Sequence, residues 1–228
     1  MVSIICCTMR NEYMENVFHN YDRQLWKKKE MIIILNASNM DKGEWKKRAK
    51  LSENVSIYQL SEATTLGECL NFGIERARYD YIAKFDDDDY YGPNYLVQSI
   101  PTFKKTNADI IGKRTVFMYF EDEKILAVNN PGRENKLVTQ GIKGATLIFK
   151  KFVFDKIKFQ KLNLGEDTVF LRQCVKNSFR IYSGDKFNYV CVRKAKKNHH
   201  TWSADNEVLL KKSSFINRTD DFRPYITK

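Results

Sequence analysis

The sequence predicts an α/β fold with a doubly wound, mostly parallel central sheet and helices on both of its faces. Apolar strand-like runs alternate with helix-like segments through roughly the first hundred residues, which is typical of parallel strands joined by helical crossovers. The run Met31–Leu35 is continuously apolar, as expected of a strand that is covered on both faces. The chain has 228 residues, of which 43% are hydrophobic, so we expect a single domain over residues 1–228.

The first half follows a strict strand–helix order. Residues 12–26 carry apolar side chains on one face of a helix, and the strand 81–85 runs directly into four aspartates. The predicted strands are 2–8, 31–35, 55–60 and 81–85, and the predicted helices are 12–26, 42–50 and 66–78. Ligands of such sheets bind at the carboxyl ends of the strands. Thr8, Arg10 and Asn36 follow two of these strands, so we expect them at the same edge as the aspartates.

The second half is less regular and predicts a small mixed sheet. Residues 110–120 and 124–128 are predicted strands, joined as a hairpin around the acidic turn 121–123. The other predicted elements are strands at 145–149 and 189–193 and a helix at 167–177. Ser203 is expected to cap a short helix through Lys212, which is followed by a tail.

The charge of the chain favours anionic partners. The formal net charge is +11, which attracts anions but does not distinguish nucleic acid, membrane surface and polyanionic carbohydrate. Six lysines and one acid lie between Lys143 and Lys161, either as a solvated face or as a surface for a polyanionic glycan acceptor. No recognised nucleic-acid-binding motif is present, so nucleic acid is the less favoured partner.

The cysteines and the N-terminal segment predict the compartment. The five cysteines form no C-x-x-C pair, so neither a zinc site nor a disulfide framework is expected. No apolar run approaches the roughly 20 residues of a membrane-spanning helix. Val2–Cys7 has the pattern of a buried strand and lacks the features of a signal peptide. We therefore expect a cytoplasmic protein, whose basic surface allows peripheral association with the inner face of the membrane.

Asp86–Asp89 form the most informative segment of the chain. Four adjacent carboxylates repel one another, and an isolated run of this kind is most simply a solvated acidic turn. Here an apolar strand precedes the run, and two tyrosines and a Gly-Pro turn close it, which indicates a built site. Mg²⁺ or Mn²⁺ would relieve the repulsion, because hard cations bind oxygen ligands and typically use one or two carboxylates with substrate phosphates.

Several motifs, in this order, make the chain resemble a family-2 glycosyltransferase of the GT-A fold. The resemblance covers roughly residues 1–195 and rests on an opening strand and loop, an N-x-G-I helix motif, a D-x-D segment followed by Y-x-P-x-Y-L, a strand with a basic turn, and a G-E-D motif. The matching segments are Val2–Asn11, Asn71–Ile74, Phe85–Leu96, Gly144–Lys151 and Gly165–Thr168. The resemblance implies a nucleotide-sugar-binding half over about 1–100, an acceptor-binding half over about 101–202, and a C-terminal helix and tail over 203–228.

The same resemblance implies roles on the donor side. Asp88 is expected to meet the metal and Asp86 the ribose or an adjacent donor group, while Thr8 and Arg10 belong to the nucleotide-facing loop. Asp87 and Asn36 are further candidates for binding the nucleotide-sugar donor. The chain departs from the family at three places. Cys7 stands where the family usually has proline, and Leu70 where it usually has arginine. The usual aspartate pair is replaced by Asn36-Ala37-Ser38. UDP is the expected nucleotide, with GDP and dTDP left open.

Asp167 matches the catalytic base of inverting family members. Acidic residues in a first helical turn also stabilise the helix dipole, which is the simplest structural explanation of Glu166 and Asp167. With the D-x-D segment upstream, we expect Asp167 to take the proton of an acceptor hydroxyl and Glu166 to orient it or bind the acceptor. The expected reaction inverts the anomeric carbon, and the expected acceptor is a cell-envelope or surface glycan.

A late histidine segment adds weaker candidates. His200 is a candidate metal ligand, because many GT-A enzymes draw a metal or diphosphate contact from a late loop; an exposed polar loop explains the segment equally well. His199 and Trp202 are candidates for contacting the acceptor or closing the site.

Two other functions compete with this interpretation. A nucleotidyltransferase of similar fold would usually carry a Gly-rich basic loop after the first strand, and Thr8-Met9-Arg10-Asn11 lacks it. A non-enzymatic basic protein that binds nucleic acid or an anionic surface would bind less tightly as salt rises. That alternative leaves both acidic motifs unexplained.

Overall fold

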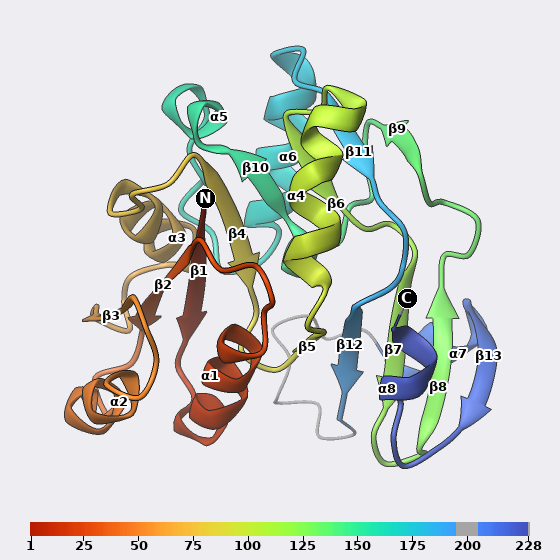
Figure 1. The fold of residues 1–228 in the computed structure, drawn as a ribbon, viewed down its shortest axis with the longest axis horizontal. Coiled ribbons are helices and arrows are strands. Elements are labelled where there is room, and N and C mark those ends of the chain that lie inside the picture. The colour runs from red at the N-terminus through yellow and green to blue at the C-terminus, as the bar shows by residue number, and fades with distance from the viewer. Residues whose placement is uncertain (195–204, 228) are drawn as a thin grey trace.

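The computed structural model describes residues 1–194 and 205–227 and contains two sheets. The first sheet comprises β1 (Val2–Thr8), β2 (Lys29–Leu35), β3 (Val55–Gln59), β4 (Tyr81–Phe85), β6 (Ile110–Gly112), β9 (Lys136–Val138), β10 (Ile148–Lys150) and β11 (Ile181–Ser183). The second comprises β5 (Tyr90–Tyr91), β7 (Val116–Phe120), β8 (Ile125–Asn129), β12 (Tyr189–Arg193) and β13 (Ser213–Arg218). Figure 1 shows the two sheets side by side.

Helices of very different length connect these strands. The α-helices are α1 (Met14–Asp22), α2 (Lys42–Ala49), α3 (Leu66–Glu75), α4 (Tyr95–Thr106), α5 (Lys151–Lys156), α6 (Glu166–Lys176), α7 (Asn206–Lys211) and α8 (Arg223–Ile226). Two short 3₁₀ helices are η1 (Asn11–Tyr13) and η2 (Gly144–Thr146). None of the helices in the described part of the chain has the length and apolar character needed to cross a bilayer.

The first sheet is doubly wound, as the sequence predicts. Its strand order is β3-β2-β1-β4-β10-β6-β11-β9, in which β10 and β9 are antiparallel to their neighbours and the others are parallel. The chain winds outward from β1 in one direction to β2 and β3, and later from β4 in the other. The carboxyl ends of β1 and β4 therefore lie at the point where the strand order reverses, which is where ligands of open α/β sheets bind.

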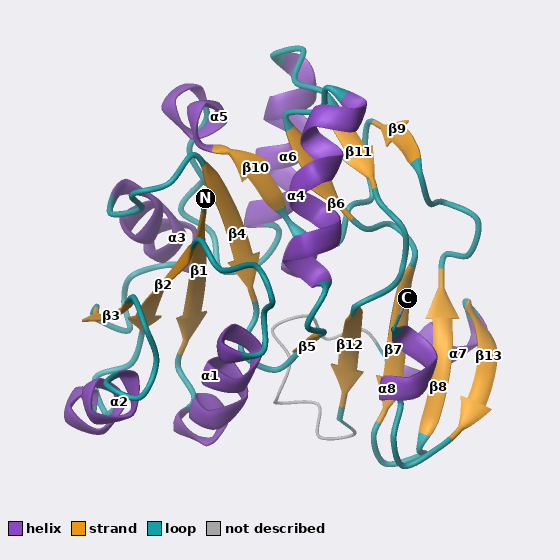
Figure 2. Cartoon of the chain, in the orientation of Figure 1, coloured by secondary structure: helices purple, strands orange, loops and turns teal. Residues whose placement is uncertain are grey.

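Helices cover both faces of this sheet, because its strands are apolar on both sides. Buried residues of α1, α2 and α4 pack on one face together with the second sheet, and those of α3, α5 and α6 pack on the other. Figure 2 shows this layering around the central strands. The side chains of β4 point to the two faces in turn. Ile82 packs with α3, α5 and α6, whereas Phe85 packs with α4.

The second sheet is small and mixed, as predicted, with the strand order β13-β8-β7-β12-β5. The hairpin between β7 and β8 is also confirmed. The prediction of one strand over 110–120 is wrong, because the chain leaves the first sheet after Gly112 and enters the second at Val116. A Cβ on Gly112 would lie 2.2 Å from Ile142 Cγ2, so the chain turns between sheets where a side chain would not fit.

Three other boundaries differ from the predictions. The predicted strand 145–149 begins only at Ile148, since η2 precedes it, and α1 ends at Asp22 rather than at residue 26. The segment 203–228 is more than a helix and a tail, because β13 pairs with β8 and completes the second sheet. Ser203, the predicted cap of α7, lies outside the described residues. The side chain of Asp205 caps α7 and accepts from the Glu207 N–H.

α4 was not predicted. Its Pro101 lies inside the helix, where proline normally ends or kinks a helical segment. Buried Tyr95, Leu96, Ile100 and Phe103 stabilise the helix against the first sheet, so tertiary packing outweighs the local signal.

Candidate functional site

The four aspartates after β4 alternate between buried and partly exposed. Asp87 and Asp89 are each 4% exposed, whereas the side chains of Asp86 and Asp88 are 35% and 14% exposed. The chain bends at residues 87–89, so neighbouring carboxylates enter different environments. Asp86 and Asp88 are therefore the more accessible pair.

Asp87 ties the aspartates to the loop after β1. Its Oδ2 accepts from Thr8 Oγ1 at 2.5 Å and from Arg10 Nε at 3.1 Å, and a second Arg10 nitrogen donates to Oδ1. Arg10 also forms an ion pair with Asp88 at 3.1 Å. Burial raises the pKa of Asp87 to about 6, against the opposing effect of Arg10. Thr8, Arg10 and the aspartates thus form one connected group, as the sheet edge predicts.

α1 holds the backbone of the same segment. Asn16 Nδ2 donates to the carbonyl oxygens of Asp87 at 2.6 Å and Asp89 at 3.0 Å. Asn20 Nδ2 donates to the Asp89 carbonyl at 2.8 Å. These bonds satisfy carbonyl groups that a sharp turn would otherwise leave unpaired, so the turn is built into the fold.

Asp89 joins the first sheet to the second. Tyr189 Oη donates to its Oδ2 at 2.5 Å, and the Val192 N–H donates to its Oδ1 at 3.1 Å. Burial raises the pKa of Asp89 to about 7. Tyr91, which stacks on Phe85 with ring centroids 3.8 Å apart, accepts from the Asp86 N–H at 2.8 Å. This aromatic support, inferred from the tyrosines in the sequence, orients the loop.

The second acidic motif begins α6. Gly165 has a positive φ of 80°, which permits the turn into the helix. Glu166 is buried, and burial raises its pKa to about 7. Asp167 is partly exposed, and its Oδ1 accepts from the Thr168 N–H at 2.6 Å. A Cβ on Gly144 would lie 1.9 Å from Asp167 Oδ2, so only glycine lets η2 approach this carboxylate.

The start of α6 is held by α3. The Leu162 carbonyl accepts from the Gly67 N–H at 3.0 Å, and Asn163 Oδ1 accepts from the Leu66 N–H at 2.9 Å. A Cβ on Gly67 would lie 1.8 Å from the Gln160 carbonyl oxygen, which makes the close approach specific to glycine. The segment before α6 is therefore anchored immediately ahead of Glu166.

Lys84 is a site residue that was not predicted. Its side chain is 8% exposed, and its Nζ forms an ion pair with Asp86. Burial would lower the pKa of Lys84, but Asp86, Glu166 and Asp167 raise it above its ordinary value. Both acidic motifs therefore act electrostatically on one buried cation, which contacts Asp86. The sequence does contain a signal for this residue: Lys84 is a lysine in an otherwise apolar strand, and that strand ends just before Asp86.

Lys143 also lies at the aspartates rather than on the predicted basic surface. It is partly buried, and its pKa is raised by Cys191 and Asp89 against the opposing effect of burial. The other five lysines of the segment 143–161 lie on or after β10. Lys143 is thus set apart from the other five lysines of the predicted cluster.

Asn36 lies at the predicted edge, but its side chain is turned toward the loop after β3. Its N–H donates to the Thr8 carbonyl at 2.8 Å, and its Nδ2 donates to the Ser61 carbonyl at 2.7 Å. The remaining candidates, His199, His200 and Trp202, lie outside the described residues.

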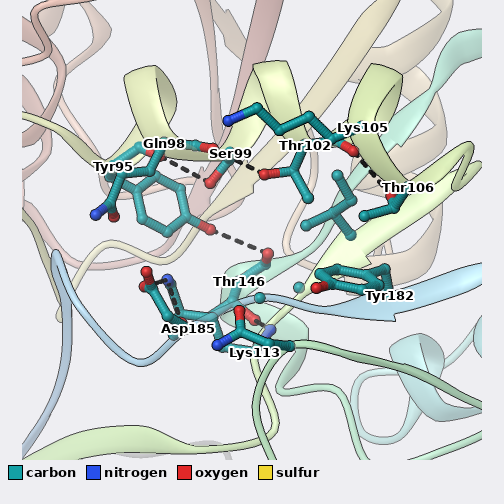
Figure 3. A pocket seen from close by; sticks show the side chains of 14 residues that line it. Tyr95, Gln98, Ser99, Thr102, Lys105, Thr106, Lys113, Thr146, Tyr182 and Asp185 are labelled. Carbon is teal, nitrogen blue, oxygen red and sulfur yellow. Dashed lines mark hydrogen bonds and ion pairs between the residues drawn. The ribbon is translucent and has the colours of Figure 1, made fainter.

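A separate cavity of about 230 Å³ lies between α4 and the ends of β6 and β11. Figure 3 shows Tyr95 directed toward Thr146, whose carbonyl accepts from Tyr95 Oη at 3.0 Å. Tyr95 also packs edge-on against Phe85 and Tyr91, so aromatic side chains stand between this cavity and the aspartates.

Comparison with known proteins decides the family. The profile of the family described as "Glycosyl transferase family 2" matches residues 3–162, which is more than half of the chain. The chain belongs to glycosyl transferase family 2. The match includes Asp86–Asp89 and ends at residue 162, before the second acidic motif at the start of α6.

Curated relatives of this family-2 chain are distant and longer. Poly-beta-1,6-N-acetyl-D-glucosamine synthase of Staphylococcus aureus strain COL is 28% identical over 108 residues, which is 46% of this chain and 26% of the relative. The enzyme of the same name from strain MSSA476 is 27% identical over the same length. The matched region thus spans about a quarter of these relatives.

Solved structures confirm the GT-A fold of this family-2 chain. S. aureus TarS 1–349 in complex with UDP-GlcNAc matches with a TM-score of 0.69 and 17% identity, covering 90% of this chain and 61% of that one. The mannosyltransferase PcManGT from Pyrobaculum calidifontis, in complex with GDP-Man and Mn²⁺, matches with a TM-score of 0.64 and 16% identity, covering 88% and 59%. At these identities the likeness concerns the fold.

The carboxylates of this family-2 site fit a metal ion whose other ligands are substrate phosphates and water. Across residues 1–194 and 205–227, no group of three or more His, Cys, Asp or Glu side chains is arranged to hold an ion. Asp86 and Asp88 nevertheless have partly exposed carboxylates, which form ion pairs with Lys84 and Arg10. Mg²⁺ and Mn²⁺ commonly bind one or two carboxylates and complete their shell with substrate phosphates and water.

Proposed function

We propose that the chain is an inverting, metal-dependent glycosyltransferase that moves a sugar from a UDP-sugar to a hydroxyl of a cell-envelope or surface glycan. The observation that carries the proposal is that both acidic motifs act electrostatically on the buried Lys84, near the carboxyl ends of β1 and β4. One motif is suited to a donor and its metal, and the other to an acceptor. Residues 1–100 would bind the donor and residues 101–202 the acceptor.

The donor side would use Asp88 and Asp86. Mn²⁺ or Mg²⁺, held by Asp88 with the donor phosphates, would neutralise the charge of the leaving diphosphate. Asp86 would accept hydrogen bonds from the ribose or an adjacent donor group. Thr8, Arg10 and Asp87 would keep the loop after β1 in place beside the nucleotide, as their mutual hydrogen bonds suggest.

The acceptor side would use Asp167 as the base. Its carboxylate would take the proton of the acceptor hydroxyl as the acceptor oxygen bonds to the anomeric carbon. The bond from that carbon to the diphosphate oxygen breaks on the opposite face, so UDP leaves and the configuration inverts. Glu166, buried beside Asp167, would orient the base or contact the acceptor.

The relatives suggest which donor to test first. UDP-GlcNAc is bound by TarS, and the curated relatives are named for a polymer of N-acetylglucosamine. GDP-mannose, bound by PcManGT, is the second donor of interest. UDP-GlcNAc is therefore our first choice, and a panel of UDP-, GDP- and dTDP-sugars extends it.

The test is donor turnover with product analysis. We expect release of UDP in the presence of Mn²⁺ or Mg²⁺, loss of turnover with EDTA, and recovery on adding metal. UDP should raise the melting temperature more with Mn²⁺ than without, because a ligand that binds only the folded state stabilises it. Unchanged turnover in EDTA would refute the metal requirement.

The competing functions give different outcomes. Release of pyrophosphate instead of UDP would indicate a nucleotidyltransferase. Binding to nucleic acid or anionic vesicles that weakens steeply with salt, without any effect of nucleotide sugars, would indicate a basic binding protein.

A further inference from the structure

Lys84 is a buried cation in the middle of an apolar environment. It lies opposite Ile5 in the β1–β4 pairing and between the buried residues Ala83 and Phe85. Removing an ammonium group from water is unfavourable unless opposite charges compensate it. The ion pair with Asp86 and the electrostatic effect of Glu166 and Asp167 provide this compensation.

Those carboxylates come from two different elements. Lys84 projects to the face of the sheet on which Ile82 contacts the α3, α5 and α6 layer, because residues two apart share a face. Its amino group forms the ion pair with Asp86 and interacts electrostatically with Glu166 and Asp167 at the start of α6. The cation thus stands between the donor-side and acceptor-side acids.

We infer that Lys84 is a positioning residue that joins the donor-side carboxylate of Asp86 to the two acids at the start of α6. The inference deepens the proposed function and rests on it for its catalytic meaning. Without the cation, Asp86 would lose its buried partner and turn to solvent, and the acids of α6 would repel it. The distance between donor and base would then no longer be held.

Lys113 provides a matched control. Its side chain is 6% exposed at the end of β6, and its Nζ donates to the Asp185 carbonyl at 2.6 Å. Figure 3 shows Lys113 beside Asp185 in the cavity under α4. Burial lowers its pKa to about 8 against the opposing effect of Asp185 and Glu134, so the carboxylates near Lys113 belong to neither acidic motif. Replacing Lys113 removes a buried ammonium without touching either acidic motif.

The first experiment compares kcat and the donor KM of the wild type, Lys84→Met, Lys84→Arg and Lys113→Met. We expect Lys84→Met to lower kcat about 100-fold, as misplacement of catalytic groups by about 1 Å does. The donor KM should change less, Lys84→Arg should recover most of kcat, and Lys113→Met should keep kcat within a few fold. Equal losses in Lys84→Met and Lys113→Met, or no rescue by arginine, would overturn the inference.

A second measurement does not depend on activity. A double-mutant cycle of Lys84→Met and Glu166→Gln, read by urea unfolding, measures the coupling of the cation to α6. We expect Glu166→Gln to be less destabilising in the Lys84→Met background, because the carboxylate there has lost its partner. Additive effects would overturn the inference. If the wild type turned over none of the donors, the proposed function would be refuted. The double-mutant cycle would still test the inference, because it measures stability and not activity.

Discussion

At the residue scale, adjacent carboxylates of identical chemistry acquire different tasks. Asp87 and Asp89 are each held by two donors from other elements, Asp87 by Thr8 and Arg10 and Asp89 by β12. Asp86 and Asp88 keep access to solvent. The buried pair thus fixes the loop, whereas the accessible pair forms ion pairs with Lys84 and Arg10.

Asp167→Asn tests the proposed base. We expect kcat to fall about 10²–10⁴-fold, the usual contribution of a general base, with donor affinity unchanged. Asp155→Asn, at an exposed acid of α5, is the control and should leave kcat unchanged. Kinetics with calorimetric measurement of donor affinity give both quantities. Transfer at the wild-type rate by Asp167→Asn would assign the base elsewhere.

Glu166 predicts a pH dependence of stability. Burial raises its pKa from 4.5 to about 7, so between these values the folded protein binds a proton that the unfolded chain releases. The contribution of Glu166 to the free energy of unfolding is therefore greatest below pH 4.5. It is lost as the pH rises through 7, and the loss is at most about 3 kcal/mol.

The comparison of wild type and Glu166→Gln isolates this effect. We expect the free energy of unfolding of the ligand-free wild type to fall more between pH 5 and pH 8 than that of the variant, since glutamine does not titrate. Urea unfolding at several pH values measures the difference. Parallel curves for the two proteins would contradict the predicted shift.

At the scale of elements, the site depends on close approaches that need glycine. η2 packs against Asp167 at Gly144, and the segment before α6 packs against α3 at Gly67. A side chain at position 67 would overlap the backbone of Gln160, so this contact fixes the segment before α6, whereas one at position 144 would overlap the side chain of Asp167.

Gly144→Ala tests the first contact. The added Cβ would lie 1.9 Å from Asp167 Oδ2 and 2.7 Å from its Cγ, so the side chain of Asp167 must rotate away. We expect kcat to fall at least about 10-fold while the melting temperature changes little, because a flexible side chain relieves the overlap. Gly184→Ala is the control, since its Cβ would find its nearest neighbour at 3.8 Å. A wild-type kcat in Gly144→Ala would show that the position of Asp167 is unimportant.

At the scale of the whole molecule, the C-terminal segment completes the second sheet. β13 pairs with β8, and the Asn188 N–H, just before β12, donates to the Ile226 carbonyl at 2.8 Å. β12 in turn holds Asp89 through Tyr189. The described C-terminal residues therefore support the site indirectly, through the strand that anchors the aspartate loop.

This support can be measured by replacing a buried and an exposed isoleucine, Ile226→Ala and Ile216→Ala. Ile226 is 1% exposed and Ile216 is 43% exposed. We expect Ile226→Ala to lower the free energy of unfolding by about 2–4 kcal/mol, through lost burial and the cavity left behind. Ile216→Ala should change it by less than about 0.5 kcal/mol. Equal effects in urea unfolding would mean that Ile226 does not stabilise the second sheet.

Local patterns in the chain are sufficient for the fold class and the main acidic motifs. The apolar strands and one-sided helices of the first hundred residues predict the doubly wound sheet, and the matching motifs predict the family, which the profile confirms. The edge position of Thr8 and Arg10 follows from the same logic, because parallel strands end together. These features depend on residues close together in the sequence.

Contacts between distant residues decide the rest. That α4 forms despite Pro101, that residues 110–120 divide between two sheets, and that Lys84 faces α6 all depend on packing between segments far apart in the chain. A lysine in a strand carries the same local signal whether its amino group meets water or carboxylates. Only the folded arrangement determines its surroundings, because burial and electrostatic interaction depend on distance in space rather than along the chain.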